Sequence, residues 1–192
     1  MIQRFQDSLQ QASYKIVFTV VGTCVVLLGA LLTVFAQSAG VSAGGKWTAY
    51  SSEDKMTGAT KVTFALPADN EDPNDDRSAQ ILLVCVDGKL KLGDFRPNTR
   101  MAPPDHPSFW SGRPQMEVMV RVDKSHERHG WNWVQGKFLA MDKDTVRELI
   151  GAQVFKIQFQ TQRGPQIAEF SPSGLDIPQV TKACGLKPKK PD

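Results

Sequence analysis

Few side chains in this sequence are arranged for chemistry, and the best cluster consists of Asp123, His126 and His129. A histidine near a carboxylate is typical of general acid–base catalysis. The two histidines are three residues apart, however, whereas the HExxH zinc motif separates its histidines by one helical turn, and no further metal ligand can be identified. These three residues are the candidates for a hydrolytic site, and a solvent-exposed polar turn at 124–130 is the alternative.

An acidic stretch at residues 68–78 (ADNEDPNDDRS) offers oxygen ligands that could hold calcium. It lacks the glycine and the terminal glutamate of an EF-hand loop, so a solvated surface loop is the simpler interpretation. The sequence also lacks a phosphate-binding glycine loop and a CxxC pair. It therefore predicts no cofactor and no metal and favours a non-enzymatic role, although scattered acidic groups and histidines can still converge in a fold.

The three cysteines fall in two parts of the chain. Cys24 lies in a long apolar stretch, whereas Cys85 and Cys184 lie in the remainder. In an oxidising compartment we expect Cys85 and Cys184 to form a disulfide. Closing a loop of about 100 residues in this way stabilises a fold by about 4–5 kcal/mol in the chain-entropy model. Two separate buried thiols are the alternative.

The apolar stretch at residues 16–36 (IVFTVVGTCVVLLGALLTVFA) contains no charged side chain and predicts a single transmembrane helix. A helix of about 20 apolar residues crosses the ~30 Å hydrocarbon layer of a bilayer with its backbone groups paired internally. Arg4 and Lys15 precede the stretch, so the positive-inside rule places residues 1–15 in the cytoplasm and the rest outside it. A cleaved signal peptide is the alternative, but its apolar core is usually shorter.

We therefore expect a single-pass membrane protein with its C-terminal domain outside the cytoplasm. Small residues at 37–45 predict a flexible linker, residues 46–186 a folded domain, and residues 187–192 a disordered basic tail. The length suffices for one domain with a sizeable core. The net charge of +3 arises from 23 basic and 20 acidic residues that are interspersed, which gives no basis for binding nucleic acid.

Short segments of alternating apolar and polar residues recur along this domain and predict an all-β sandwich. Asp87 and Gly88 form the clearest hairpin turn, because this dipeptide suits the positive φ angles of a type I′ turn. The predicted strands are 46–51, 60–66, 80–86, 89–95, 116–123, 131–141, 153–161 and 166–170.

One or two short helices are expected to accompany the strands. The first covers 142–151 and begins at Asp142, a good N-cap residue, and the second covers 177–183 and is followed by Gly185. Cys184 closes the second helix, so the expected disulfide would fasten that helix to the strand that carries Cys85.

Between the predicted strands lies a long proline-rich loop at 96–115, with Phe109 and Trp110 near its middle. Loops of this length are uncommon and often functional. If their side chains are exposed, Phe109 and Trp110 are the candidate partner-binding residues. Alternatively, these two aromatic residues cover one end of the core.

A series of short motifs occurs in an order that resembles the VasI/TagO type of small exported β-rich domains, which are accessory proteins of bacterial type VI secretion. The motifs are Trp47, DKMT at 54–57, LVC at 83–85, DGKL at 87–90, VRVD at 120–123, AEF at 168–170, SGL at 173–175 and ACG at 183–185. The resemblance implies bridged cysteines and an accessory role in the periplasm or at the inner membrane, without a defined enzymatic activity.

The expected function is that of a non-enzymatic docking protein of a cell-envelope complex. Its expected partners are the inner membrane and a protein assembly such as a type VI secretion apparatus. Two alternatives remain open: a module that binds or acts on peptidoglycan, and an exclusion protein of a phage or plasmid.

Overall fold

The computed structural model describes residues 40–70, 78–108 and 111–189. The predicted cytoplasmic tail, the predicted anchor at 16–36, most of the acidic stretch and the pair Phe109 and Trp110 lie outside these residues. Within the described ranges, no helix has the length and apolar character needed to cross a bilayer.

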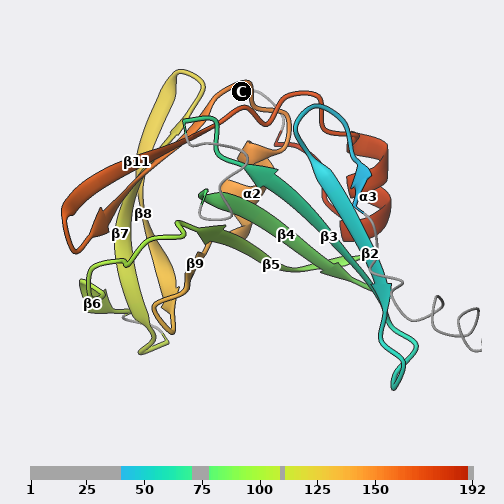
Figure 1. Ribbon diagram of the computed structural model, residues 1–192, viewed down its shortest axis with the longest axis horizontal. Helices are drawn as coiled ribbons and strands as arrows, with labels where there is room; N and C mark the ends of the chain where they lie inside the picture. Colours follow the sequence, from blue (N-terminus) through green and yellow to red (C-terminus); the bar gives the residue numbers. More distant parts are fainter. Residues whose placement is uncertain (1–39, 71–77, 109–110, 190–192) are drawn as a thin grey trace, which may run out of the picture. The chain divides into compact units, whose positions relative to one another are not determined.

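The described part of the chain is mostly β, as the alternating pattern predicts, with two short helices (Figure 1). The strands are β1 (Val41–Ser42), β2 (Thr48–Glu53), β3 (Thr60–Pro67), β4 (Gln80–Val86), β5 (Lys89–Arg96), β6 (His106–Pro107), β7 (Pro114–Val122), β8 (Ser125–Val134), β9 (Phe138–Ala140), β10 (Phe155–Thr161) and β11 (Gly164–Phe170). The helices are α2 (Lys143–Leu149) and α3 (Ile177–Cys184).

All strands belong to one antiparallel ladder with the order β1-β2-β3-β4-β5-β9-β8-β7-β10-β11, and β6 pairs with β7. β5 and β10 are four strand steps apart in this order, which would separate them by about 19 Å in a flat sheet. The rings of Phe95 on β5 and Phe159 on β10 nevertheless lie 5.0 Å apart between centroids. The sheet therefore bends over on itself, and its two halves face each other across a shared core.

The core follows from strict alternation along the strands. On β10, Phe155, Ile157 and Phe159 are buried, as predicted, and the residues between them are half-buried or exposed. Phe95 also contacts the ring of Phe170 on β11, with 6.2 Å between centroids. Aromatic side chains from both halves of the bent sheet therefore fill one core.

Both predicted helices form, and their caps explain where they begin and end. The carboxylate of Asp142 accepts a hydrogen bond from the backbone N–H of Thr145 at the start of α2. Asp176 caps α3 in the same way, and Gly185 ends it in the left-handed conformation. The predicted disulfide is also present between Cys85 on β4 and Cys184 on α3, and both cysteines are buried.

The predicted flexible linker at 37–45 is folded where it is described. Val41 and Ser42 pair with β2, and Ala43 is only 1% exposed. Gly44 has a φ of 92°, and a Cβ atom at this position would collide with the backbone carbonyl of Gly174. Here small residues allow two backbones to pack closely, whereas the sequence pattern suggested flexibility.

Two further predictions need correction. The predicted polar turn at 124–130 is mostly strand, because β8 already begins at Ser125 and continues to Val134. The single strand predicted at 131–141 is divided into the end of β8 and the short β9. Gln135 and Gly136 interrupt it with positive φ angles, which fit a tight turn and not an extended strand.

Candidate functional site

The three residues predicted to form a hydrolytic site are not brought together. His126 and His129 both lie on β8, where residues three apart point to opposite faces of the sheet. Asp123 instead accepts hydrogen bonds at Oδ1 from the backbone N–H groups of Gln153 and Val154, both at 2.9 Å. Asp123 thus fastens the loop that precedes β10. Among the described residues, no three histidine, cysteine or acidic side chains could hold a metal ion together.

His129 has other partners, which sequence spacing did not reveal. Its Nδ1 lies 3.2 Å from Oδ2 of Asp142 and 3.3 Å from the hydroxyl of Thr145. That hydroxyl donates to Oδ2 of Asp142 at 2.7 Å, and the ring N–H of Trp131 donates to the same oxygen at 3.2 Å. Asp142 and Thr145 follow His129 by 13 and 16 residues and belong to a different element, so only the packing of α2 against β8 unites them.

The electrostatics of this group favour an ionised carboxylate. Burial acts to raise the pKa of Asp142, but hydrogen bonds from the backbone and hydroxyl of Thr145, the charge of His129 and the ring N–H of Trp131 together hold this pKa below its ordinary value. A carboxylate-bound imidazole has the geometry of a general base. The hydroxyl beside it cannot serve as a nucleophile, because Thr145 is fully buried.

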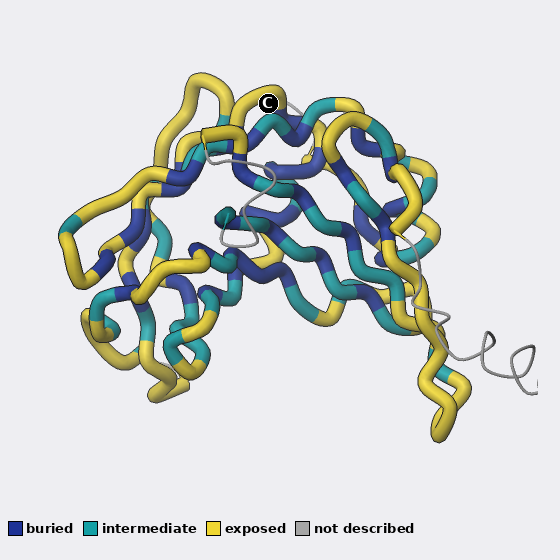
Figure 2. The backbone as a smooth tube through the Cα atoms, viewed as in Figure 1, coloured by how far each residue is buried: buried dark blue, intermediate teal, exposed yellow. Residues whose placement is uncertain are grey.

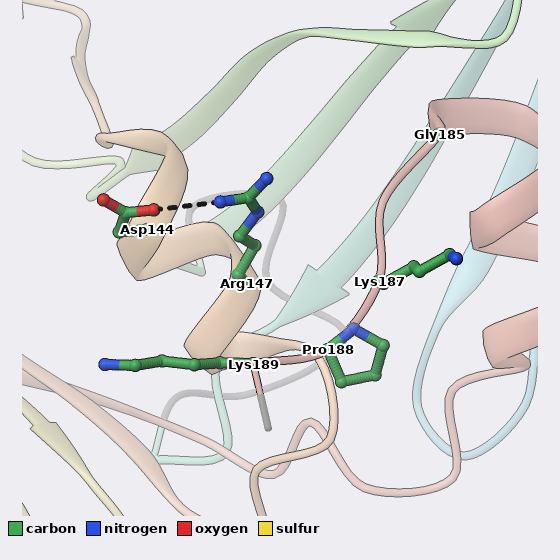
Figure 3. A pocket seen from close by; sticks show the side chains of 6 residues that line it. All are labelled: Asp144, Arg147, Gly185, Lys187, Pro188 and Lys189. Carbon is green, nitrogen blue, oxygen red and sulfur yellow. Dashed lines mark hydrogen bonds and ion pairs between the residues drawn. The ribbon is translucent and has the colours of Figure 1, made fainter. Parts of the chain in front are cut away.

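A second feature is a pocket of about 530 Å³ between α2 and the chain that follows α3 (Figure 3). It is lined by Asp144, Arg147, Gly185, Lys187, Pro188 and Lys189. Figure 3 shows the guanidinium of Arg147 turned towards Asp144, and the ammonium groups of Lys187 and Lys189 pointing to opposite sides. The three basic groups therefore do not converge on one anion.

Residues 187–189, part of the predicted basic tail, line this pocket. The backbone N–H of Lys189 donates to the carbonyl of Arg147, and its ammonium group pairs with Glu148 at 2.7 Å. The described part of the basic tail is thereby attached to α2.

The third feature is an apolar surface on the outward face of the sheet. β4 reads QILLVCV, so its outward residues Leu82, Val84 and Val86 are as apolar as its inward ones. A strand without polar alternation is typical of a sheet covered on both faces. Here the inward residues are fully buried, whereas the outward ones are only half-buried (Figure 2).

Neighbouring strands extend this surface, because residues opposite each other in an antiparallel ladder share a face. The register places Ala65 opposite Leu82, Leu92 opposite Val84 and Ala140 opposite Asp94. We call the set Ala65, Leu82, Val84, Leu92 and Ala140 the outer patch.

A charged pair lies within the outer patch. Asp94 is 0% exposed, and its Oδ2 accepts a hydrogen bond from Nη2 of Arg96 at 3.0 Å. Neither Oδ1 of Asp94 nor Nε of Arg96 has a hydrogen-bond partner in the described part of the chain. The guanidinium of Arg96 also lies 5.4 Å above the ring centroid of Phe138. Burial raises the pKa of Asp94, and the hydrogen bond and charge of Arg96 oppose that rise.

The rim of the outer patch is basic. Lys61, Lys89 and Lys91 stand at one end of β3 and β5, and Arg96 stands at the other. None of the three lysines forms an ion pair with another described residue. On the outward positions of β3, β4 and β5, the single acidic residue is the buried Asp94. This face is therefore complementary to an apolar surface that carries negative charge at its edge.

Of the loop predicted to bind a partner, the structure describes the residues on either side of Phe109 and Trp110. The backbone N–H of Ser108 donates to the carbonyl of Arg113 at 2.7 Å. These two aromatic residues lie outside the described residues, so their role in partner binding stays a prediction. No family model, no curated protein and no solved structure matches this chain.

Proposed function

We propose that this protein is a membrane-anchored docking module of a cell-envelope assembly in the periplasm, and that the outer patch receives its protein partner. The observation that carries the proposal is the apolar outward face of β4, which is only half-buried although its sequence is typical of a strand covered on both sides.

Two features of the chain support export. The disulfide between Cys85 and Cys184 is of a kind that persists in oxidising compartments such as the periplasm. The uncharged stretch at 16–36 has the length of a membrane span, and basic residues precede it. The envelope assembly that we propose is a type VI secretion apparatus, because the order of the short motifs resembles that of its accessory proteins.

The chemistry of the outer patch defines the partner. Full burial of a valine or leucine side chain contributes about 1.5–3 kcal/mol relative to full exposure, so covering Leu82, Val84 and Leu92 completely would add only part of that amount for each. The lysines at the rim and Arg96 would steer a partner that carries carboxylates around an apolar centre. The occupant we propose is therefore a protein surface with an apolar centre and an acidic rim.

Photo-crosslinking in intact cells tests this proposal. A photoreactive amino acid at position 92 should give one discrete adduct, and the same group at Gln160, an exposed position on β10, should not. Leu92→Lys should abolish partner recovery, whereas Gln160→Lys should leave it unchanged. Equal crosslinking at both positions, or full recovery with Leu92→Lys, would refute the outer patch as the docking site.

The hydrogen bond between His129 and Asp142 favours a second candidate, a module that acts on peptidoglycan. An imidazole held by a carboxylate could serve as a general base for hydrolysis. Purified protein incubated with cell-wall sacculi should then release soluble fragments, and His129→Gln should stop that release. Co-sedimentation without release would indicate a peptidoglycan-binding module. If the protein neither releases fragments nor co-sediments with the sacculi, protein docking is the supported function.

A further inference from the structure

The exposed apolar side chains are concentrated at one corner of the sheet. Five large apolar residues are exposed in the described part of the chain, and three of them lie on β1, on β2 and in the turn between β2 and β3. They are Val41, Tyr50 and Met56, with exposed fractions of 64%, 42% and 92%. Met56 is the most exposed of the five, and it lies at the tip of the β2–β3 hairpin.

This hairpin tip is an ordered structure. Oδ1 of Asp54 accepts hydrogen bonds from the backbone N–H groups of Met56 and Thr57 at 2.8 and 3.3 Å. The backbone N–H of Gly58 donates to the carbonyl of Asp54 at 2.7 Å, and the φ of Gly58 is 70°. Figure 2 shows the hairpin as an exposed loop that projects beyond the rest of the sheet. The turn thus holds the apolar side chain of Met56 out into solvent, next to Lys55.

The direction of β1 shows towards which end of β2 the chain that precedes β1 points. β1 is antiparallel to β2, with Val41 opposite Ala49 and Ser42 opposite Thr48. The side chain of Tyr50 lies against Gly40, one residue before β1. Going backwards along β1, the backbone therefore heads towards the end of β2 at which the hairpin turns.

Chain length then limits the distance between the domain and a membrane. Four residue steps join Ala36, the last residue of the uncharged stretch, to Gly40, and they reach at most about 14 Å however they are arranged. From Tyr50, β2 and its turn extend about 15 Å in the same direction, at about 3.3 Å per residue. The headgroup layer of a bilayer is itself about 5–7 Å thick on each side. The hairpin tip is therefore long enough to reach the lipid surface.

We propose that the β2–β3 hairpin tip is a membrane-contacting element, with Met56 inserted among lipid headgroups and acyl-chain ends and Lys55 beside the phosphates. An apolar side chain flanked by a lysine suits this layer, because the first leaves water and the second keeps its charge near the headgroups. This inference rests on the proposed anchoring by residues 16–36. It adds a second attachment point. Two attachment points would restrict how the domain, and with it the outer patch, is oriented relative to the bilayer.

Fluorescence quenching in vesicles tests the inference with the full chain. In a Cys24→Ser background with the native disulfide intact, Met56→Cys is labelled with an environment-sensitive dye. The control, Gln162→Cys, lies in the exposed turn between β10 and β11, next to β11 at the opposite end of the strand order. A spin label on the lipid headgroups should quench the dye at position 56 several-fold more strongly than the dye at position 162. Equal quenching at the two positions would refute the inference.

Flotation of the same vesicles separates this inference from the proposed anchoring. Protein that fails to float with the lipid would overturn the anchoring itself. Protein that floats but shows no preferential quenching at position 56 would overturn the hairpin contact alone. In addition, trypsin should cleave after Lys55 more slowly in vesicles than after Arg163 in the β10–β11 turn, and Met56→Glu should remove that protection. Rapid cleavage after Lys55 in the unmutated protein would contradict a lipid contact.

Discussion

The disulfide between Cys85 and Cys184 permits the most quantitative prediction. The two cysteines are 99 residues apart, so the bridge closes nearly two thirds of residues 40–192 into one loop. In the chain-entropy model, a loop of about 100 residues lowers the free energy of the folded state relative to the unfolded state by about 4.7 kcal/mol. Because small domains have total stabilities of about 5–15 kcal/mol, loss of the bridge should remove a large part of the stability.

The assay is equilibrium urea unfolding of a fragment with residues 40–192, which forms a compact unit. Cys85→Ser combined with Cys184→Ser should lower the free energy of unfolding by about 4–5 kcal/mol. Reduction of the unmutated fragment is the matched control, because it breaks the same loop and keeps both sulfur atoms in the core. A loss below about 1 kcal/mol in both experiments would refute the loop-entropy argument. A large loss with the double variant alone would assign the effect to core packing.

Three further predictions concern single side chains. Gly44→Ala should lower the free energy of unfolding by well over 1 kcal/mol, because the added Cβ would collide with the backbone of Gly174. The control is Gly164→Ala, at a position with φ 109° and open space around it, which should lower the free energy of unfolding less in the same urea titration. Asp142→Asn should destabilise the fold at neutral pH and lose this effect as the pH falls, since the pKa of Asp142 is lowered by folding and its stabilisation disappears once the carboxylate is protonated. Asp94→Asn should show the opposite trend: the pKa of Asp94 is raised by folding, so the unmutated protein should gain stability relative to the variant as the pH falls from 7 towards the ordinary pKa of aspartate. Thermal unfolding from pH 7 to below the ordinary pKa of aspartate, where the carboxylate of Asp142 becomes protonated, checks both signs. A trend of the same sign for the two variants would contradict the assigned environments.

Local signals in the sequence determined a large part of the fold. The Asp87-Gly88 turn has positive φ angles at both residues, at 49° and 73°, as its type requires. Asp142 begins α2 and Gly185 ends α3, because capping depends on a few adjacent residues. These features could be predicted because the interactions that stabilise them involve only residues within a few positions of each other in the sequence. The all-β class followed from the same kind of local alternation.

The sites depended on contacts that sequence spacing does not contain. The partners of His129 are supplied by α2, and Asp123, its neighbour in the sequence, turned out to fasten a loop instead. Gly44 lies in the segment predicted to be a flexible linker, because small residues suit both mobile linkers and close backbone packing. The tertiary structure alone decided between these roles.

The sequence by itself predicted most of the strands, both helices with their caps, and the disulfide between Cys85 and Cys184. Only the tertiary structure decided that the outward face of β4 stays partly open to solvent and that Asp94 is buried among apolar residues. The physical reason is that periodicity shows which residues share a face, whereas burial of that face depends on what the rest of the chain places against it.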